Sequence, residues 1–80
     1  MMNNVRATAV RLEDGRLIVE LCDGDVLIVP LDDFPNLRAA SHEQLQRVRI
    51  SPSGHGLHWD ELDEDLSVVE LMRNYKKFRR

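Results

Sequence analysis

Apolar and polar residues alternate along the first third of the chain, and this pattern predicts β-strands. Residues 5–9 alternate with a period of two, and residues 17–22 have three apolar side chains on one face. Residues 26–29 are apolar at every position, which indicates a strand that is central or covered. Pro30 ends this run, because proline lacks the backbone N–H that a sheet needs. Together these segments predict a three-stranded antiparallel meander.

Turn residues divide the strands at three places. Glu13-Asp14-Gly15-Arg16 provides the first turn, and Asp23-Gly24 the second. At Asp23-Gly24 we expect a type I′ hairpin turn, in which both central residues have positive φ. Ser51-Pro52-Ser53-Gly54 has proline second and glycine fourth, as a β-turn prefers. It separates the alternating segment 47–50 from the segment 57–59, so these two predict a second hairpin.

Short helices are expected in the middle of the chain and near its end. Pro35 suits the first turn of one helix, and Ser41 with Gln44 has the spacing of a capping box for another. A second capping box, Ser67 with Glu70, predicts the start of a C-terminal helix. Its apolar stripe follows helical spacing: Val68, Leu71, Met72 and Tyr75.

The sequence therefore predicts an α+β fold. We expect an antiparallel sheet of about five strands, formed by the meander and the second hairpin, with short helices mainly on one face and a C-terminal helix. With 80 residues the chain predicts one domain, 1–80, with a modest core that a homodimer would help to stabilise. Cys22 is the single cysteine, which excludes an internal disulfide framework. No signal peptide or membrane span is visible, and we expect a cytoplasmic protein.

Charge is distributed unevenly around a net value of −3. All fourteen acidic residues precede residue 73, whereas the last eight residues carry five positive charges and no acid. The chain thus combines an acidic body with a basic tail, 73–80. The tail residues that could contact nucleic acid are Arg73, Lys76, Lys77, Arg79 and Arg80.

Several segments together resemble a known bacterial family, the domain of unknown function 2442. The resemblance rests on the Asp-Gly turn of residues 21–24, the segment 34–37, the glycine-to-tryptophan segment 54–59, and the Leu-Asp-Glu-Asp run within 62–67. It spans about residues 5–72, and the basic tail lies beyond it. The resemblance implies an α+β fold and frequent pairing with another small protein, an arrangement that suggests a toxin–antitoxin pair. It supplies no catalytic residue.

Five carboxylates within six residues form the most concentrated chemistry of the chain. They are Asp60, Glu61, Asp63, Glu64 and Asp65. Three interpretations stay open: a solvated loop next to a helix whose dipole favours negative charge, a docking site for a basic partner, and a cation site. The spacing and the internal glycine of a calcium-binding loop are absent. Asp60 and Glu61, which precede the helix by the largest distance, are the least explained by its dipole.

The remaining candidates predict structure more than chemistry. His55 and His58 are three apart, and in a strand such residues point to opposite faces, so we expect no metal site there and no cofactor. Trp59 is expected to anchor the core. Without a nucleophile motif, a phosphate-binding loop or a cleft, we expect no enzyme. The leading hypothesis is a non-enzymatic protein-binding module, an antitoxin-like partner of a small basic protein. The alternatives are a nucleic-acid-binding accessory acting through the tail, and a structural homo-oligomer.

Overall fold

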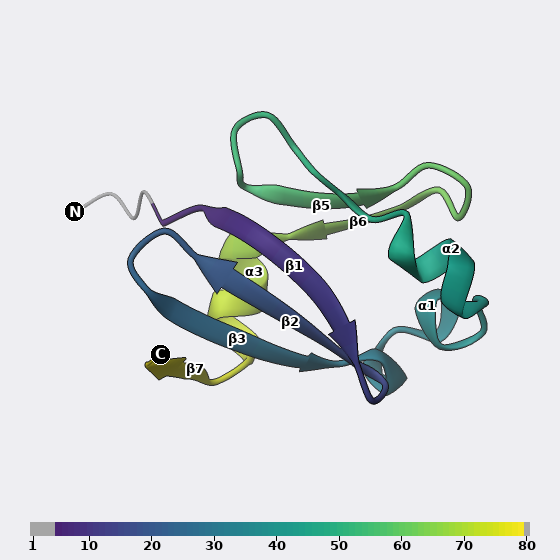
Figure 1. Cartoon of the computed structure of the whole chain (residues 1–80), viewed down its shortest axis with the longest axis horizontal. Coiled ribbons are helices and arrows are strands. Elements are labelled where there is room, and N and C mark those ends of the chain that lie inside the picture. Colours follow the sequence, from purple (N-terminus) through teal and green to yellow (C-terminus); the bar gives the residue numbers. More distant parts are fainter. Residues whose placement is uncertain (1–4, 80) are drawn as a thin grey trace.

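The computed structural model describes residues 5–79, which form seven short strands and four short helical segments (Figure 1). The strands are β1 (Ala7–Glu13), β2 (Arg16–Leu21), β3 (Asp25–Pro30), β4 (Arg49–Ile50), β5 (Gly56–Trp59), β6 (Glu64–Ser67) and β7 (Lys77–Arg79). The helical segments are the 3-10 turn η1 (Leu31–Asp33) and the α-helices α1 (Pro35–Arg38), α2 (His42–Gln46) and α3 (Val68–Asn74). The α+β class is as the sequence predicts.

The strands divide into two antiparallel sheets instead of one. The larger sheet has the order β1-β2-β3-β7, and the smaller has the order β4-β5-β6. The predicted meander and second hairpin are both present, but the expected count of about five strands missed β6 and β7. Strand β6 escapes a search for alternation because Leu66 is its one buried residue. Strand β7 escapes it because all three of its residues are exposed.

The two Asp-Gly turns of the meander differ in type. Asp14 and Gly15 have φ of 49° and 76° and join β1 to β2 with two residues, as a type I′ turn does. The type I′ turn expected at Asp23-Gly24 is wrong, because only Gly24 has positive φ, 94°. Its N–H donates to the Leu21 carbonyl at 3.0 Å, so the loop has three residues and ends on a left-handed glycine.

The capping box of α2 and the turn before β5 form as predicted, whereas the box predicted at α3 is half formed: the Ser67 hydroxyl accepts from the Glu70 N–H at 3.4 Å. The Ser41 hydroxyl accepts from the Gln44 backbone N–H at 3.1 Å, and the Gln44 side-chain oxygen Oε1 accepts from the Ser41 N–H at 3.0 Å, which completes the capping box of α2. In the turn that precedes β5, the Gly54 N–H donates to the Ser51 carbonyl at 2.8 Å. Pro35 occupies the first position of α1. No described helix has the length and apolar character needed to cross a membrane.

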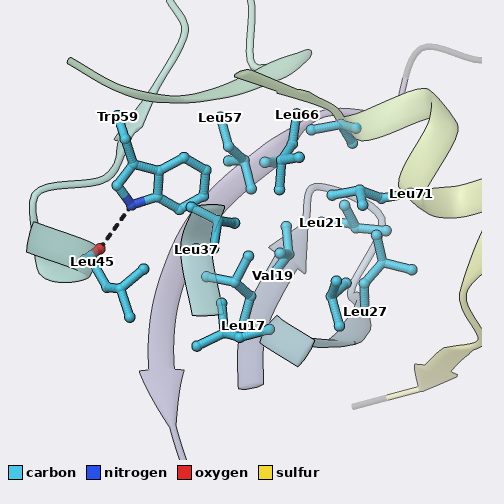
Figure 2. Close-up of a cluster of buried hydrophobic side chains, with 14 residues drawn as sticks. Leu17, Val19, Leu21, Leu27, Leu37, Leu45, Leu57, Trp59, Leu66 and Leu71 are labelled. Carbon is cyan, nitrogen blue, oxygen red and sulfur yellow. Dashed lines mark hydrogen bonds between the residues drawn. The ribbon is translucent and has the colours of Figure 1, made fainter. Parts of the chain in front are cut away.

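The core lies between the two sheets (Figure 2). Leucine and valine side chains of β2 and β3 face Leu57 and Trp59 of β5 and Leu66 of β6, and each of the helices α1, α2 and α3 adds a leucine. Trp59 is the largest fully buried side chain, with 1% exposed. Its indole N–H donates to the Leu45 carbonyl at 3.0 Å, so the ring joins β5 to α2. The prediction that Trp59 anchors the core is confirmed.

The C-terminal helix ends earlier than its apolar stripe suggests. Helix α3 stops at Asn74, and Tyr75 has extended backbone, with φ −129° and ψ 150°. The Tyr75 hydroxyl donates to an Asp33 carboxylate oxygen at 2.7 Å, and its ring lies 6.3 Å from that of Phe34. These contacts to the segment after β3 direct the chain back along the larger sheet. The basic tail therefore continues as strand β7, antiparallel to β3, and not as a helix end.

Candidate functional site

The five clustered carboxylates lie on one structural feature, the acidic turn, which we define as residues 60–65. It follows β5 and runs into the first two residues of β6. Asp63 has a left-handed backbone, with φ 51°, and its N–H donates to the Asp60 carbonyl at 3.4 Å. Aspartate tolerates this conformation better than most residues, so the sequence suits the reversal of the chain here.

Two arginines from the segment before β5 pair with the start of the acidic turn. Arg49 Nη1 lies 3.1 Å from Asp60 Oδ2, and Arg47 Nη1 lies 3.2 Å from Glu61 Oε2. Pairing of β4 with β5 places Arg49 opposite His58, and this register brings the arginines beside the turn. The two acids that the helix dipole explains least are thus held by guanidinium groups. Since all four side chains are more than half exposed, each pair adds little stability.

His58 links the two ends of the acidic turn. Its Nε2 lies 2.7 Å from Asp60 Oδ1, and its Nδ1 lies 2.5 Å from Asp65 Oδ1. Asp65 stands directly opposite His58 in the β5–β6 ladder, so the register of the sheet creates the contact. The hydrogen bond to Asp65 is the main cause that raises the pKa of His58 above its ordinary value, with further help from the negative charges of Asp65 and Asp60. Protonated His58 therefore holds the two ends of the turn together through its contacts with Asp60 and Asp65.

We expect the stability of the protein to fall as pH rises through the pKa of His58. A raised folded-state pKa means that the folded chain binds the proton more tightly than the unfolded chain does. The stabilisation is therefore complete below the ordinary histidine pKa of about 6.5 and is lost as pH rises through the higher folded-state pKa. The midpoint of urea unfolding, measured from about pH 6 to pH 9, should show this decline. In the His58→Gln variant this side chain cannot titrate, so its urea midpoint should change less with pH. Equal slopes of midpoint against pH for the two proteins would contradict the stabilising role of protonated His58.

The other carboxylates of the acidic turn are less constrained. Glu64 Oε1 accepts a hydrogen bond from Asn36 Nδ2 at 2.9 Å, which ties the turn to α1. The Asp63 carboxylate has neither a hydrogen bond nor an ion pair with any residue of the range 5–79. Beside the turn lies a surface pocket of about 370 Å³, lined by Gln44, Arg47, Arg49, Trp59, Asp60 and Glu61. The turn thus presents negative charge next to a concave surface.

The histidines and acids do not gather into a metal centre within the described range. Among residues 5–79, no group of three or more His, Cys, Asp or Glu side chains has an arrangement that could hold a metal ion. His58 is engaged by two carboxylates, whereas His55 lies before β5, where its carbonyl accepts from the Val68 N–H at 2.9 Å. His42, at the start of α2, contacts the Gln46 side chain at 3.0 Å.

The basic residues of the tail are distributed over α3, its end and β7. Arg73 lies in the last turn of α3, Lys76 precedes β7, and Lys77 and Arg79 belong to it, while Arg80 lies outside the described residues. Lys77 and Arg79 stand opposite Leu27 and Asp25 of β3, and Lys77 Nζ lies 3.8 Å from Asp25 Oδ2. The basic tail, which begins at the end of the C-terminal helix, therefore continues into an edge strand of the larger sheet.

The two charged features lie at opposite ends of the molecule. Figure 1 shows the β5–β6 connection, which contains the acidic turn, at one end of the long axis and β7 at the other. The structure does not bring the candidate partner-binding acids and the candidate tail cations together. Arg47 and Arg49, which neutralise part of the acidic turn, were not singled out from the sequence; their alternation with Val48 in the first strand of the predicted second hairpin is the signal that could have found them.

The geometry defines a small α+β protein of two antiparallel sheets with an acidic turn at one end and a basic edge strand at the other. The family model for the protein of unknown function DUF2442 matches residues 7–77, so the chain belongs to this family. The match extends beyond the expected limit of residue 72 and includes α3 and the start of β7. A comparison with curated proteins found no match.

Two solved structures of uncharacterised proteins are similar to this chain. A crystal structure of a protein of unknown function from Rhodospirillum rubrum has 39% sequence identity and a TM-score of 0.81, with 90% of this chain and 89% of that chain covered. A solution NMR structure of an uncharacterised protein from Chromobacterium violaceum has 30% identity and a TM-score of 0.73, with 85% of this chain and 64% of that chain covered. These matches support the fold and name no activity.

Proposed function

We propose that this chain is a non-enzymatic, cytoplasmic protein-binding module and that its partner is a small basic protein, as in an antitoxin-like pair. The observation that carries the proposal is the acidic turn, which concentrates five carboxylates at one end of the molecule. Two guanidinium groups and His58 neutralise only part of that charge. A cationic partner would be attracted to the excess, and its association would be faster at low ionic strength.

The ion pairs within the turn support this role because they hold the binding surface in place. Arg47 at the end of α2, Arg49 of β4 and Asn36 of α1 contact the turn, so three of its carboxylates are oriented before a partner arrives. Preorganisation of this kind reduces the entropy that association costs. Asp63, whose carboxylate is not engaged within residues 5–79, is the charge most available to a partner. The neighbouring pocket beside Trp59 offers room for a partner side chain.

The decisive variant is Asp63→Asn, compared with Asp14→Asn as a matched control. Both aspartates have left-handed backbone, with φ of 51° and 49°, and asparagine tolerates that conformation equally well. Each change removes one exposed negative charge, but Asp14 belongs to the β1–β2 turn, outside the acidic turn. The two variants therefore differ in the position of the lost charge and hardly in fold.

The partner is first captured from the native host by affinity purification, identified by mass spectrometry and then purified. We expect Asp63→Asn to slow association with it by about two- to fivefold at low salt, consistent with up to ~1 kcal/mol for an exposed ion pair. Asp14→Asn should leave the rate unchanged, and high salt should remove the difference. Equal rates for the wild type and both variants, or an acidic partner, would overturn the proposal.

A further inference from the structure

Strand β7 ends the larger sheet with an unusual combination of features. It pairs with β3 on one side and is the last strand in the sheet order, so its other side offers backbone groups to a further strand. All three of its residues are exposed. Phe78 is 45% exposed, and among residues 5–79 no other large hydrophobic side chain is classed as exposed. The strand thus displays an aromatic ring between two cations, Lys77 and Arg79.

We propose that β7 is a docking edge for an extended acidic segment of a partner protein, which adds to the larger sheet as a new strand. In such an arrangement the backbone hydrogen bonds supply affinity, and alternate side chains supply specificity. Lys77 and Arg79 point to one face of the sheet and would meet carboxylates of the incoming strand. Phe78 points to the other face and would meet an apolar side chain.

The register of the sheet places an apolar surface under that second contact. Phe78 stands opposite Val26, and Ile28 lies two residues further along β3 on the same face. Ile28 is in turn opposite Ile18 of β2. This face is the one turned away from the core, since the core-facing residues of β3 are Leu27 and Val29. Phe78 therefore extends an apolar row on the outer face of the sheet, where a partner residue can pack.

The surroundings of β7 favour an acidic peptide over a nucleic acid. Asp25 stands opposite Arg79 and lies 3.8 Å from the Lys77 amine, and Asp23 is two residues away in the adjoining turn. A phosphate chain along this edge would meet these carboxylates as well as the cations. A peptide is less affected, because most of its contacts would be backbone hydrogen bonds. Of the tail aromatics, Tyr75 is held by Asp33, which leaves Phe78 alone for base stacking.

Short edge strands with lysine also occur as protection against unwanted pairing, and this role makes a contrasting prediction. If the cations of β7 only repel other strands, removing them should promote self-association. If they attract an acidic strand, removing them should weaken its binding and leave the chain as it was. The inference does not depend on the proposed function, because it concerns the opposite end of the molecule and a partner segment of opposite charge.

The test uses the full-length chain labelled with ¹⁵N and a short synthetic peptide in which glutamate and valine alternate. We expect the peptide to shift the amide resonances of β7 and β3 in NMR spectra and to slow hydrogen exchange of β7 amides. A lysine–valine peptide of the same length serves as the probe control. The expected order of affinity is the acidic peptide first, then a single-stranded oligonucleotide, then the basic peptide.

Two variants and a matched control locate the binding. Arg79→Glu should weaken binding of the acidic peptide by about fivefold or more at low salt, since it replaces an attraction by a repulsion. Arg38→Glu makes the same charge change at an exposed position of α1 and should leave binding unchanged. Phe78→Ala should weaken binding about two- to fivefold at any salt concentration, because the apolar contact of the ring is lost.

Three results would overturn the inference. One is the absence of shifts at β7 with the acidic peptide; another is tighter binding of the oligonucleotide than of the peptide. The third is self-association of the Arg79→Glu variant, seen as earlier elution in size-exclusion chromatography, which would assign β7 a protective role. If these tests fail, the proposed role of the acidic turn is unaffected. If the Asp63→Asn test fails, the proposed role of β7 is unaffected.

Discussion

Replacing Trp59 with alanine is expected to lower the free energy of unfolding by about 3–5 kcal/mol. The indole is 1% exposed and is the largest fully buried side chain, so its removal leaves a large cavity between the two sheets. The change also removes the indole N–H that the Leu45 carbonyl accepts at 3.0 Å. A domain of 80 residues has a total stability of roughly that size. The variant should therefore be largely unfolded at room temperature.

The measurement is urea or thermal denaturation followed by far-ultraviolet circular dichroism, because the variant loses the single tryptophan that fluorescence would report. Trp59→Phe is the informative companion. It keeps most of the buried apolar volume but cannot donate to Leu45, so it should cost roughly 1–3 kcal/mol from the unsatisfied carbonyl and the smaller ring. A Trp59→Ala protein that keeps the thermal midpoint of the wild type would contradict the central place of this residue in the core.

The sequence predicts those parts of the fold in which a segment carries its own signal. The meander, the second hairpin and the capping box of α2 follow from local alternation, Asp-Gly turns and the Ser41–Gln44 spacing. Strands β6 and β7 could not be found this way, because their pairing partners, and not their own side chains, make them strands. Leu66 is the single buried residue of β6, and β7 has none.

Turn type was similarly decided by context. Both Asp-Gly pairs fit a type I′ turn, but only Asp14-Gly15 has exactly two residues between paired strand ends, Glu13 and Arg16. At Asp23-Gly24 three residues lie between the end of β2 and the start of β3, and of these only the glycine has positive φ. Register is a property of two strands together, so a single segment does not determine it.

In the candidate site too, the types of residue present could be predicted from the sequence, but the contacts between them could not. The concentration of carboxylates at residues 60–65 is visible in the sequence, but their neutralisation by Arg47, Arg49 and His58 depends on which strands are adjacent. Asp60 and Glu61, the acids that the helix dipole explains least, are therefore compensated by arginines in the folded chain. Asp63 takes their place as the most available charge, because its contacts within the described residues are limited to the backbone.

Replacing Gly54 with alanine is expected to lower the free energy of unfolding by roughly 2–4 kcal/mol, of which about 1–2 kcal/mol is the cost of a left-handed backbone for a residue with a Cβ. Gly54 has φ +80°, and a Cβ at this position would lie 2.7 Å from Arg6 Cβ and 3.3 Å from the Ala7 carbonyl oxygen. The Ala7 N–H donates to the Gly54 carbonyl at 2.8 Å, which holds the two segments together. The close approach joins the start of β1 to the turn before β5, so relief of the clash would separate the two sheets there.

Gly24→Ala is the matched control for this prediction. Gly24 also has positive φ, +94°, but apart from its two chain neighbours no residue has an atom within 4 Å of the Cβ that alanine would add. It should therefore show the conformational cost alone, about 1–2 kcal/mol, and retain the contact between the sheets. Chemical denaturation of the two variants separates the backbone cost from the cost of contact, because the same residue is introduced into the same region of φ. Equal losses for Gly54→Ala and Gly24→Ala would mean that the segment around Arg6 moves aside freely and that the contact between β1 and the turn before β5 does not help to hold the two sheets together.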